Sequence, residues 1–331
     1  KIAYWFFASA LLLLVLQIVY GFIMGFAHMG YDNLHEWIPF NTARAVHTNL
    51  LVFWILLGFM GSAHFIIPEE ADRELAWPKL AYLQLISFLV VGVTAIVCYH
   101  MNIWEGRKFL EIPRPLDYLV VANVLLFLAN IGWTIWNGKR FTTTAIVLYM
   151  GLLCAALLYL PGMISFDNQT LDSFYRWWVV HLWVEGVWEL IMGGILCFLL
   201  IKLTGVDREV VEKWLYIIVG LTFISGILGT GHHYYYIGVP ATGSSLVVSS
   251  PLSSLSPSLA WPSTLSPWRK RVDANTLTKP PSPGRSAVPS CHLSVLVSSA
   301  SPTLCHRSTC GHTAHWSPPC TATSPSGGPT P

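Results

Sequence analysis

Residues 177–189 have the sequence Trp-Trp-Val-Val-His-Leu-Trp-Val-Glu-Gly-Val-Trp-Glu. They lie in an apolar run, residues 177–203, which exceeds the ~20 residues that an α-helix needs to cross a bilayer. Three ionisable side chains stand within this run: His181, Glu185 and Glu189. Ionisable groups are costly to place at membrane depth, so they mark candidate functional sites. The stretch therefore predicts a membrane-spanning helix that carries a polar site.

The composition of the whole chain is that of a membrane protein. Of its 331 residues, 53% are hydrophobic and 11% are charged, whereas a soluble domain averages about 25% charged residues. The 15 tryptophans suit the aromatic belts at membrane surfaces. The net charge of +2 gives no indication of a nucleic-acid partner. We expect an all-α, polytopic transmembrane bundle of about seven spans. The predicted spans are 3–24, 46–67, 80–99, 119–136, 143–163, 177–203 and 215–236.

Basic residues are shared unequally between the two sides of this predicted bundle. The side that bears the N-terminus holds Arg73, Lys79, Lys139, Arg140, Lys202, Arg208 and Lys213. The opposite side holds Arg44, Arg107, Lys108, Arg114 and Arg176. Because cytoplasmic loops carry an excess of Lys and Arg, the N-terminus is predicted to be cytoplasmic.

Four histidines are predicted to lie at one depth in the membrane. In this topology His47 and His181 follow the points where two helices enter from the outer face, and His232 and His233 precede the point where a third leaves. At a rise of 1.5 Å per residue, all four lie roughly 10 Å below the outer surface. His47 alone would suggest a hydrogen-bonded membrane histidine. Its shared depth favours axial ligation of a haem iron.

Three histidines and a carboxylate form a ligand set for a transition metal such as iron, zinc or manganese. His181 and Glu185 project about 40° apart on a regular helix, and Glu189 extends the same stripe. His232 and His233 would diverge by about 100°, so both reach one metal only if the helix end is distorted or the metal lies between them. The alternative is a set of polar contacts between helices.

The chain changes character near Thr242. Residues 243–331 are rich in Ser and Pro and contain no sustained apolar period, so no span can be drawn there. Such a composition is typical of disorder. We therefore expect a truncated transmembrane domain at residues 1–242 followed by a disordered tail at 243–331.

Four stretches together carry a resemblance to a known family. They are Arg-Ala-Val-His-Thr-Asn-Leu at 44–50, the stretch already quoted at 177–189, Thr-Gly-Val-Asp-Arg-Glu at 204–209 and Gly-Thr-Gly-His-His-Tyr at 229–234. With them, residues 3–240 resemble the large subunit of bacterial nitric oxide reductase, in the haem-copper oxidase superfamily. Such a protein is a multi-pass protein of the bacterial cytoplasmic membrane.

The resemblance implies roles for the predicted metal ligands. His181, His232 and His233 would hold the non-haem iron, with Glu185 as its carboxylate ligand. Glu189 would lie behind these ligands and assist proton delivery, so both glutamates are predicted to be catalytic. The carboxylate separates this family from oxygen-reducing relatives, which hold copper with three histidines. A hard oxygen ligand favours iron over copper.

The resemblance also implies cofactors and partners. His47 would be one axial ligand of a low-spin haem b, and a second haem, b3, would face the non-haem iron. Electrons would arrive from a cytochrome c-type subunit or a quinol, and two NO would become N2O and water. Family members often carry a glutamate associated with a calcium site where Lys108 stands, which puts calcium in doubt here. An oxygen-reducing terminal oxidase and a non-catalytic membrane fragment are the alternatives.

The tail is predicted to be a translated wrong reading frame. From Ser301 to Pro331, joining the last base of each codon to the first two of the next permits a run containing Thr-Ala-Met-His-Gly-His-Phe-Ala-Phe-Trp-Gly-Ala-Tyr. This run matches the family's haem-ligand stretch. The slip is placed near residues 242–245, and the missing haem histidines are encoded under Thr321 and Thr323. The chain as written is therefore expected to lack the ligands of haem b3 and to be inactive.

Overall fold

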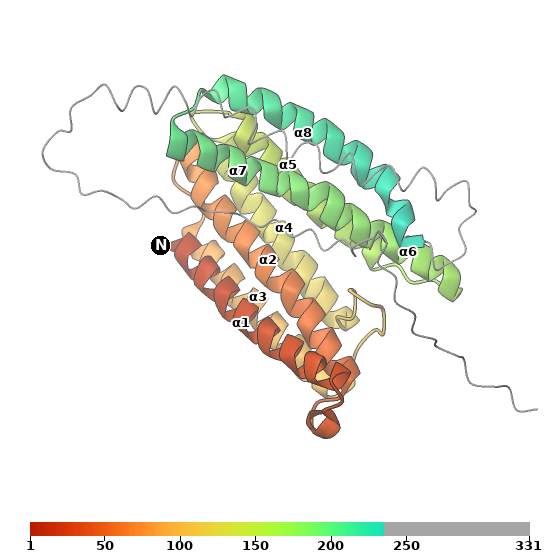
Figure 1. Ribbon diagram of the computed structural model, residues 1–331. Helices are drawn as coiled ribbons and strands as arrows, with labels where there is room; N and C mark the ends of the chain where they lie inside the picture. Colours follow the sequence, from red (N-terminus) through yellow and green to blue (C-terminus); the bar gives the residue numbers. More distant parts are fainter. Residues whose placement is uncertain (235–331) are drawn as a thin grey trace, which may run out of the picture. The chain divides into compact units, whose positions relative to one another are not determined.

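A computed structural model describes residues 1–234, and within them the secondary structure is helical, with no strand. The α-helices are α1 (Ile2–His28), α2 (Phe40–Ala71), α3 (Pro78–His100), α4 (Arg114–Trp136), α5 (Thr143–Gly162), α6 (Gln169–Leu182), α7 (Glu189–Thr204) and α8 (Arg208–Gly229) (Figure 1). A π-helical segment, Trp183–Trp188, joins α6 to α7. Short 3-10 segments follow α1, at Asp32–Glu36, and α8, at Thr230–Tyr234. The predicted all-α class is confirmed.

Six helical segments of the described chain are long and apolar enough to cross a membrane. They are α1 to α5 and the continuous segment Gln169–Thr204, and each overlaps a predicted span. The seventh predicted span, 215–236, is displaced by seven residues, because α8 begins at Arg208 and ends at Gly229. The Asp207 side chain accepts a hydrogen bond from the backbone N–H of Glu209 at 3.0 Å. This N-cap starts the helix ahead of its apolar part.

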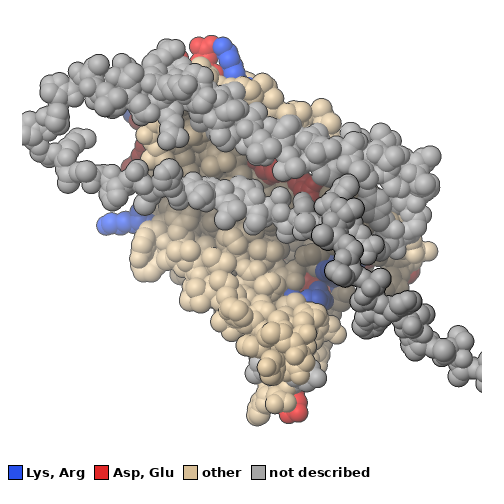
Figure 2. Space-filling model, in the orientation of Figure 1, with Lys and Arg blue, Asp and Glu red and all other residues tan. Residues whose placement is uncertain are grey.

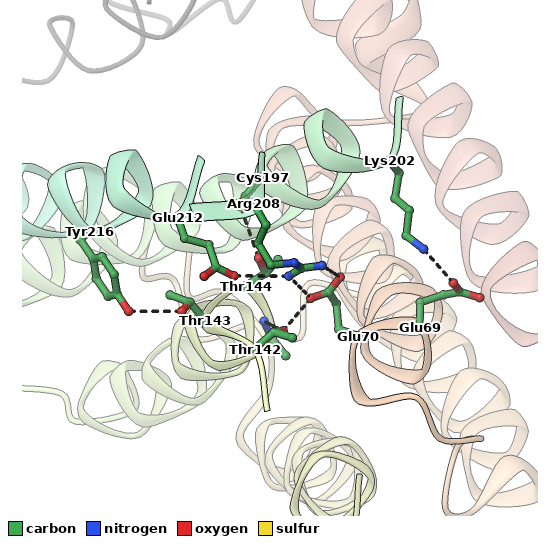
Figure 3. A network of polar contacts seen from close by, with 11 residues as sticks. Glu69, Glu70, Thr142, Thr143, Thr144, Cys197, Lys202, Arg208, Glu212 and Tyr216 are labelled. Carbon is green, nitrogen blue, oxygen red and sulfur yellow. Dashed lines mark hydrogen bonds and ion pairs between the residues drawn. The ribbon is translucent and has the colours of Figure 1, made fainter. Parts of the chain in front are cut away.

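Polar contacts tie the helices together at both ends of the bundle. At one end, which we call the His47 end, Arg44 near the start of α2 forms a 2.9 Å ion pair with Glu111, in the segment before α4. At the other, the Glu70 end, the guanidinium of Arg208 binds both carboxylate oxygens of Glu70 at 2.7 and 2.9 Å (Figure 3). The end of α2 thus meets the start of α8, as expected for helices that cross the membrane alternately.

Helix α2 is the centre of the described bundle. It packs against α1, α3, α4, α5 and α7, and its core side chains include Leu57 and Ile67, which are fully buried. Helix α1, by contrast, exposes large apolar side chains such as Trp5 and Leu12. In Figure 2 the lower surface, which the grey residues leave uncovered, is almost wholly tan, with charged residues mainly at its edges. In a membrane, such a surface faces lipid.

Several sequence predictions lie outside the described residues. They are the change of character at Thr242, the disordered tail at 243–331, and the haem histidines encoded under Thr321 and Thr323.

Candidate metal centre

The segment that carries Glu185 is a π-helix rather than the regular α-helix that we predicted. Trp183–Trp188 interrupts the helix between His181 and Glu189. A π-turn is wider than an α-turn, so it changes the direction of the side chains that follow it. Glu189 follows this turn at the start of α7. Its carboxylate accepts a hydrogen bond from the Thr222 hydroxyl of α8 at 3.2 Å.

His232 and His233 sit in a 3-10 turn that ends α8. Their ring centroids are 4.2 Å apart, with 44° between the ring planes. On a regular helix the two rings would point in divergent directions. The helix end is therefore distorted from regular α-helix, which is one of the two ways in which both rings could reach a single metal.

The four predicted metal ligands converge. One ligand atom from each of His181, Glu185, His232 and His233 lies within 4.8 Å of the others. Glu185 Oε1 is 3.7 Å from His181 Nδ1 and 3.4 Å from His232 Nε2. His233 Nε2 is 3.1 Å from His181 Nδ1. These side chains come from α6, the π-segment and the turn after α8, so the fold assembles the site from elements about 45 residues apart in the chain.

These separations fit a single transition-metal ion. Ligand atoms bound at about 2.1 Å around a tetrahedral ion are about 3.4 Å from one another. The three measured distances bracket that value. Imidazole nitrogens and a carboxylate oxygen are also the donor set expected for iron or zinc. The donor set and these three separations therefore fit a transition-metal ion.

Aromatic side chains support one wall of this centre. The indole of Trp177 stacks on the His233 ring, with centroids 4.5 Å apart and an interplanar angle of 8°. The guanidinium of Arg176 lies 5.8 Å from the centre of the Trp177 ring. His181 is buried, whereas the Glu185 side chain remains 36% exposed within the described part of the chain. The described residues thus leave the centre open on the Glu185 side.

His47 is held by α1. Its Nδ1 lies 2.8 Å from the backbone carbonyl oxygen of Gln17, and because a carbonyl only accepts, Nδ1 is the protonated nitrogen. In the neutral ring Nε2 then carries a lone pair, which is what an axial haem ligand needs. The amide nitrogen of Gln17 lies 3.5 Å from Nε2 and must turn aside for a haem to bind. A six-coordinate haem also needs a second axial ligand.

A buried carboxylate near His47 was not assigned a role by the sequence. Glu111 is fully buried and accepts hydrogen bonds from Arg44 at 2.9 Å and from the Asn49 amide at 2.8 Å. Burial raises the pKa of Glu111, and the two hydrogen bonds oppose that shift. The sequence offered one sign of this buried carboxylate: two polar side chains, Arg44 and Asn49, stand on the first turns of α2 and both donate to it. Lys108 is exposed, and its ammonium lies 5.3 Å from the centre of the Phe109 ring.

A bundle of membrane-length helices that brings three histidines and a carboxylate together defines an integral membrane protein with a candidate metal centre. The family described as cytochrome c and quinol oxidase polypeptide I matches residues 1–279, and the chain belongs to it. The chain is also 46% identical over 266 residues to a nitric oxide reductase subunit from Stutzerimonas stutzeri. That similarity covers 76% of this chain and 56% of the relative, so the chain spans little more than half of the relative's length.

Proposed function

We propose that this chain derives from the catalytic subunit of a respiratory nitric oxide reductase in a bacterial cytoplasmic membrane. The observation that carries the proposal is the convergence of Glu185 with His181, His232 and His233. A three-histidine site alone would serve copper in an oxygen reductase. The carboxylate adds a hard donor that selects iron. Similarity to a nitric oxide reductase subunit supports the same choice.

The four ligands would hold a non-haem iron. When bound, that iron supplies a Lewis-acidic site for NO beside a haem. The protein's own part would be to hold the ligands in place and to deliver protons. Two NO, two electrons and two protons give N2O and water. Glu189, which accepts a hydrogen bond from Thr222 on the neighbouring helix, would relay those protons toward Glu185.

The described residues provide for one haem only in part. His47 presents an unprotonated Nε2, which suits a low-spin haem b. Its second axial ligand and the proximal ligand of haem b3 are proposed to be encoded in the alternative frame under Thr321 and Thr323. The chain as written would then bind little haem and be inactive. Electrons would come from a cytochrome c-type subunit or a quinol, and Lys108 argues against a calcium site.

Metal selectivity tests the iron assignment. The full chain, purified in detergent without metal, is offered Fe2+ anaerobically and, in a parallel sample, Cu+. We expect one tightly held iron per chain and weaker retention of copper. A Glu185→His variant, which restores a purely nitrogenous ligand set, should shift the preference toward copper. Retention of copper in place of iron by the unaltered chain would support the oxygen-reductase alternative instead.

The frame proposal has a separate test. The nucleotide sequence around codons 240–246 is determined. The family match extends past the proposed slip, to residue 279, so the reading frame at these codons needs a direct check. The unrepaired and single-base-repaired genes are then expressed in membranes with haem supplied, and reduced-minus-oxidised spectra are recorded. We expect a b-type haem signal from the repaired chain only. A normal signal from the unrepaired chain overturns the frame proposal, and none from an expressed, repaired chain overturns the nitric oxide reductase assignment.

A further inference from the structure

Helix α8 packs against the π-segment, and Gly226 lies in that contact. A Cβ atom placed on Gly226 would lie 3.1 Å from the Cα of Gly186 and 3.2 Å from the carbonyl oxygen of Glu185. Both are backbone atoms of the turn that presents the Glu185 carboxylate. Backbone atoms cannot move out of the way by a change of rotamer, whereas the end of a flexible side chain can. The two backbones approach this closely only because residue 226 has no side chain.

The close approach depends on Gly226 and not on glycine in general. A Cβ on Gly186, the partner residue, would meet only Leu182 Cδ2, at 3.9 Å, which is an ordinary contact. A Cβ on Gly220, six residues earlier on α8, would meet nothing within 4 Å. Of these three glycines, Gly226 alone sets a distance between two elements.

Gly226 also contacts the turn that carries the other two ligands. Its carbonyl oxygen accepts a hydrogen bond from the hydroxyl of Thr230 at 3.1 Å. Thr230 is the residue at which α8 gives way to the 3-10 turn holding His232 and His233. Gly226 thus contacts the backbone of Glu185 on one side. On the other, its carbonyl bonds the first residue of the turn that carries the two histidines.

We propose that Gly226 is a positioning residue of the metal centre. It fixes the separation between the π-segment, which bears Glu185, and the turn that bears His232 and His233. This inference rests on the proposed metal centre, because it concerns the distances among its ligands. In Gly226→Ala the π-segment and α8 move apart by a few tenths of an ångström or more. Metal–ligand bonds tolerate about 0.2 Å, so the centre loses part of its ligand set.

Cobalt binding to the full chain in detergent tests this proposal. Co2+ takes the same donors as Fe2+, is stable in air, and has a visible spectrum that reports coordination number. We expect Gly226→Ala to bind Co2+ about 10–100-fold more weakly than the unaltered chain, the range seen when supporting residues of metal sites are lost. Its spectrum should also change in shape and intensity. Gly220→Ala should match the unaltered chain in both respects.

A milder variant covers the case in which Gly226→Ala does not fold. Thr230→Val removes the hydrogen bond to the Gly226 carbonyl while keeping the shape of the side chain, and should weaken Co2+ binding severalfold. Circular dichroism and gel filtration establish that each variant is folded. If folded Gly226→Ala, or Thr230→Val where the former is unfolded, binds Co2+ like Gly220→Ala with the same spectrum, Gly226 is not a positioning residue. If the unaltered chain binds no Co2+, the proposed metal centre itself fails.

Discussion

At the scale of a single residue, Glu185 is the side chain on which the choice between the proposed iron site and a three-histidine copper site depends. Its Oε1 lies within 3.7 Å of His181 Nδ1 and 3.4 Å of His232 Nε2, inside the space that one ion would share. Glu189 is the other carboxylate at this depth, but it bonds Thr222 and lies outside the converging set. We therefore propose separate roles for the two glutamates, with Glu185 in metal binding and Glu189 in proton supply.

Replacing each glutamate by glutamine tests this separation. We expect Glu185→Gln to lower Co2+ affinity by at least about tenfold, because an amide oxygen is a weaker donor than a carboxylate and loss even of supporting contacts costs that much. Glu189→Gln should change the affinity by less than about twofold, since Gln can still accept the hydrogen bond of Thr222. Isothermal titration of both variants makes the comparison. Equal losses in the two variants would place Glu189 among the ligands and contradict the assignment.

The sequence was sufficient to name the four converging residues but not to arrange them. Apolar surroundings make each ionisable side chain conspicuous, and helical spacing pairs His181 with Glu185. The π-turn was beyond the sequence pattern, because a π-turn inserted in an α-helix leaves the apolar run unbroken. The same holds for the change to a 3-10 turn at Thr230, where the hydroxyl of Thr230 bonds the carbonyl of Gly226 four residues earlier.

At the scale of elements, membrane length made the helices predictable and their ends less so. Helix α6 begins at Gln169, eight residues before the predicted span, because the Asn168 side chain accepts hydrogen bonds from the N–H groups of Thr170 and Leu171. Such a cap adds polar turns that a hydropathy pattern omits. What the apolar pattern could not show is how helix ends are joined to one another.

The strongest of these joints links α2, α5 and α8 at the Glu70 end (Figure 3). Glu70, whose side chain is 2% exposed, receives Arg208 through two hydrogen bonds and Thr142 through a third, at 2.6 Å. Lys202 and Glu69 form a neighbouring pair at 3.2 Å, but both side chains are about half exposed. The chain thus offers a buried and an exposed ion pair side by side.

Breaking the two pairs should have unequal effects on stability. Arg208→Met leaves Glu70 buried with a single hydroxyl partner, and we expect a loss of about 2–3 kcal/mol, below the usual cost because Arg208 is itself partly exposed. That corresponds to a fall of about 5–10 °C in apparent melting temperature by circular dichroism in detergent. Lys202→Met should change it by less than about 2 °C. In Glu70→Gln/Arg208→Met part of the loss should be recovered, because no unpaired charge remains buried. Equal effects of the two single variants would show that burial of Glu70 is unimportant.

At the scale of the whole molecule, the candidate metal centre and the Glu70–Arg208 ion pair lie toward opposite ends of the helix bundle. His181 follows Asp172 by nine residues, about 14 Å along a helix, and Asp172 pairs with Arg107 at the His47 end. The metal centre therefore lies nearer to the His47 end, and the Glu70–Arg208 joint lies at the other. If the N-terminal side is cytoplasmic, protons and electrons reach the centre most directly from the outer side of the membrane.

The orientation itself is the last prediction, and it rests on a difference of two basic residues between the faces. Lys108 is exposed in the segment before α4, at the His47 end, and Lys139 is 77% exposed in the segment before α5, at the Glu70 end. We replace each by cysteine in a chain whose seven native cysteines are serine. A membrane-impermeant maleimide should label residue 108 in intact spheroplasts and residue 139 only after lysis, because positively charged loops are retained in the cytoplasm. The reverse pattern would invert the molecule and bring the metal centre close to the cytoplasm, so that protons would then be drawn from inside the cell.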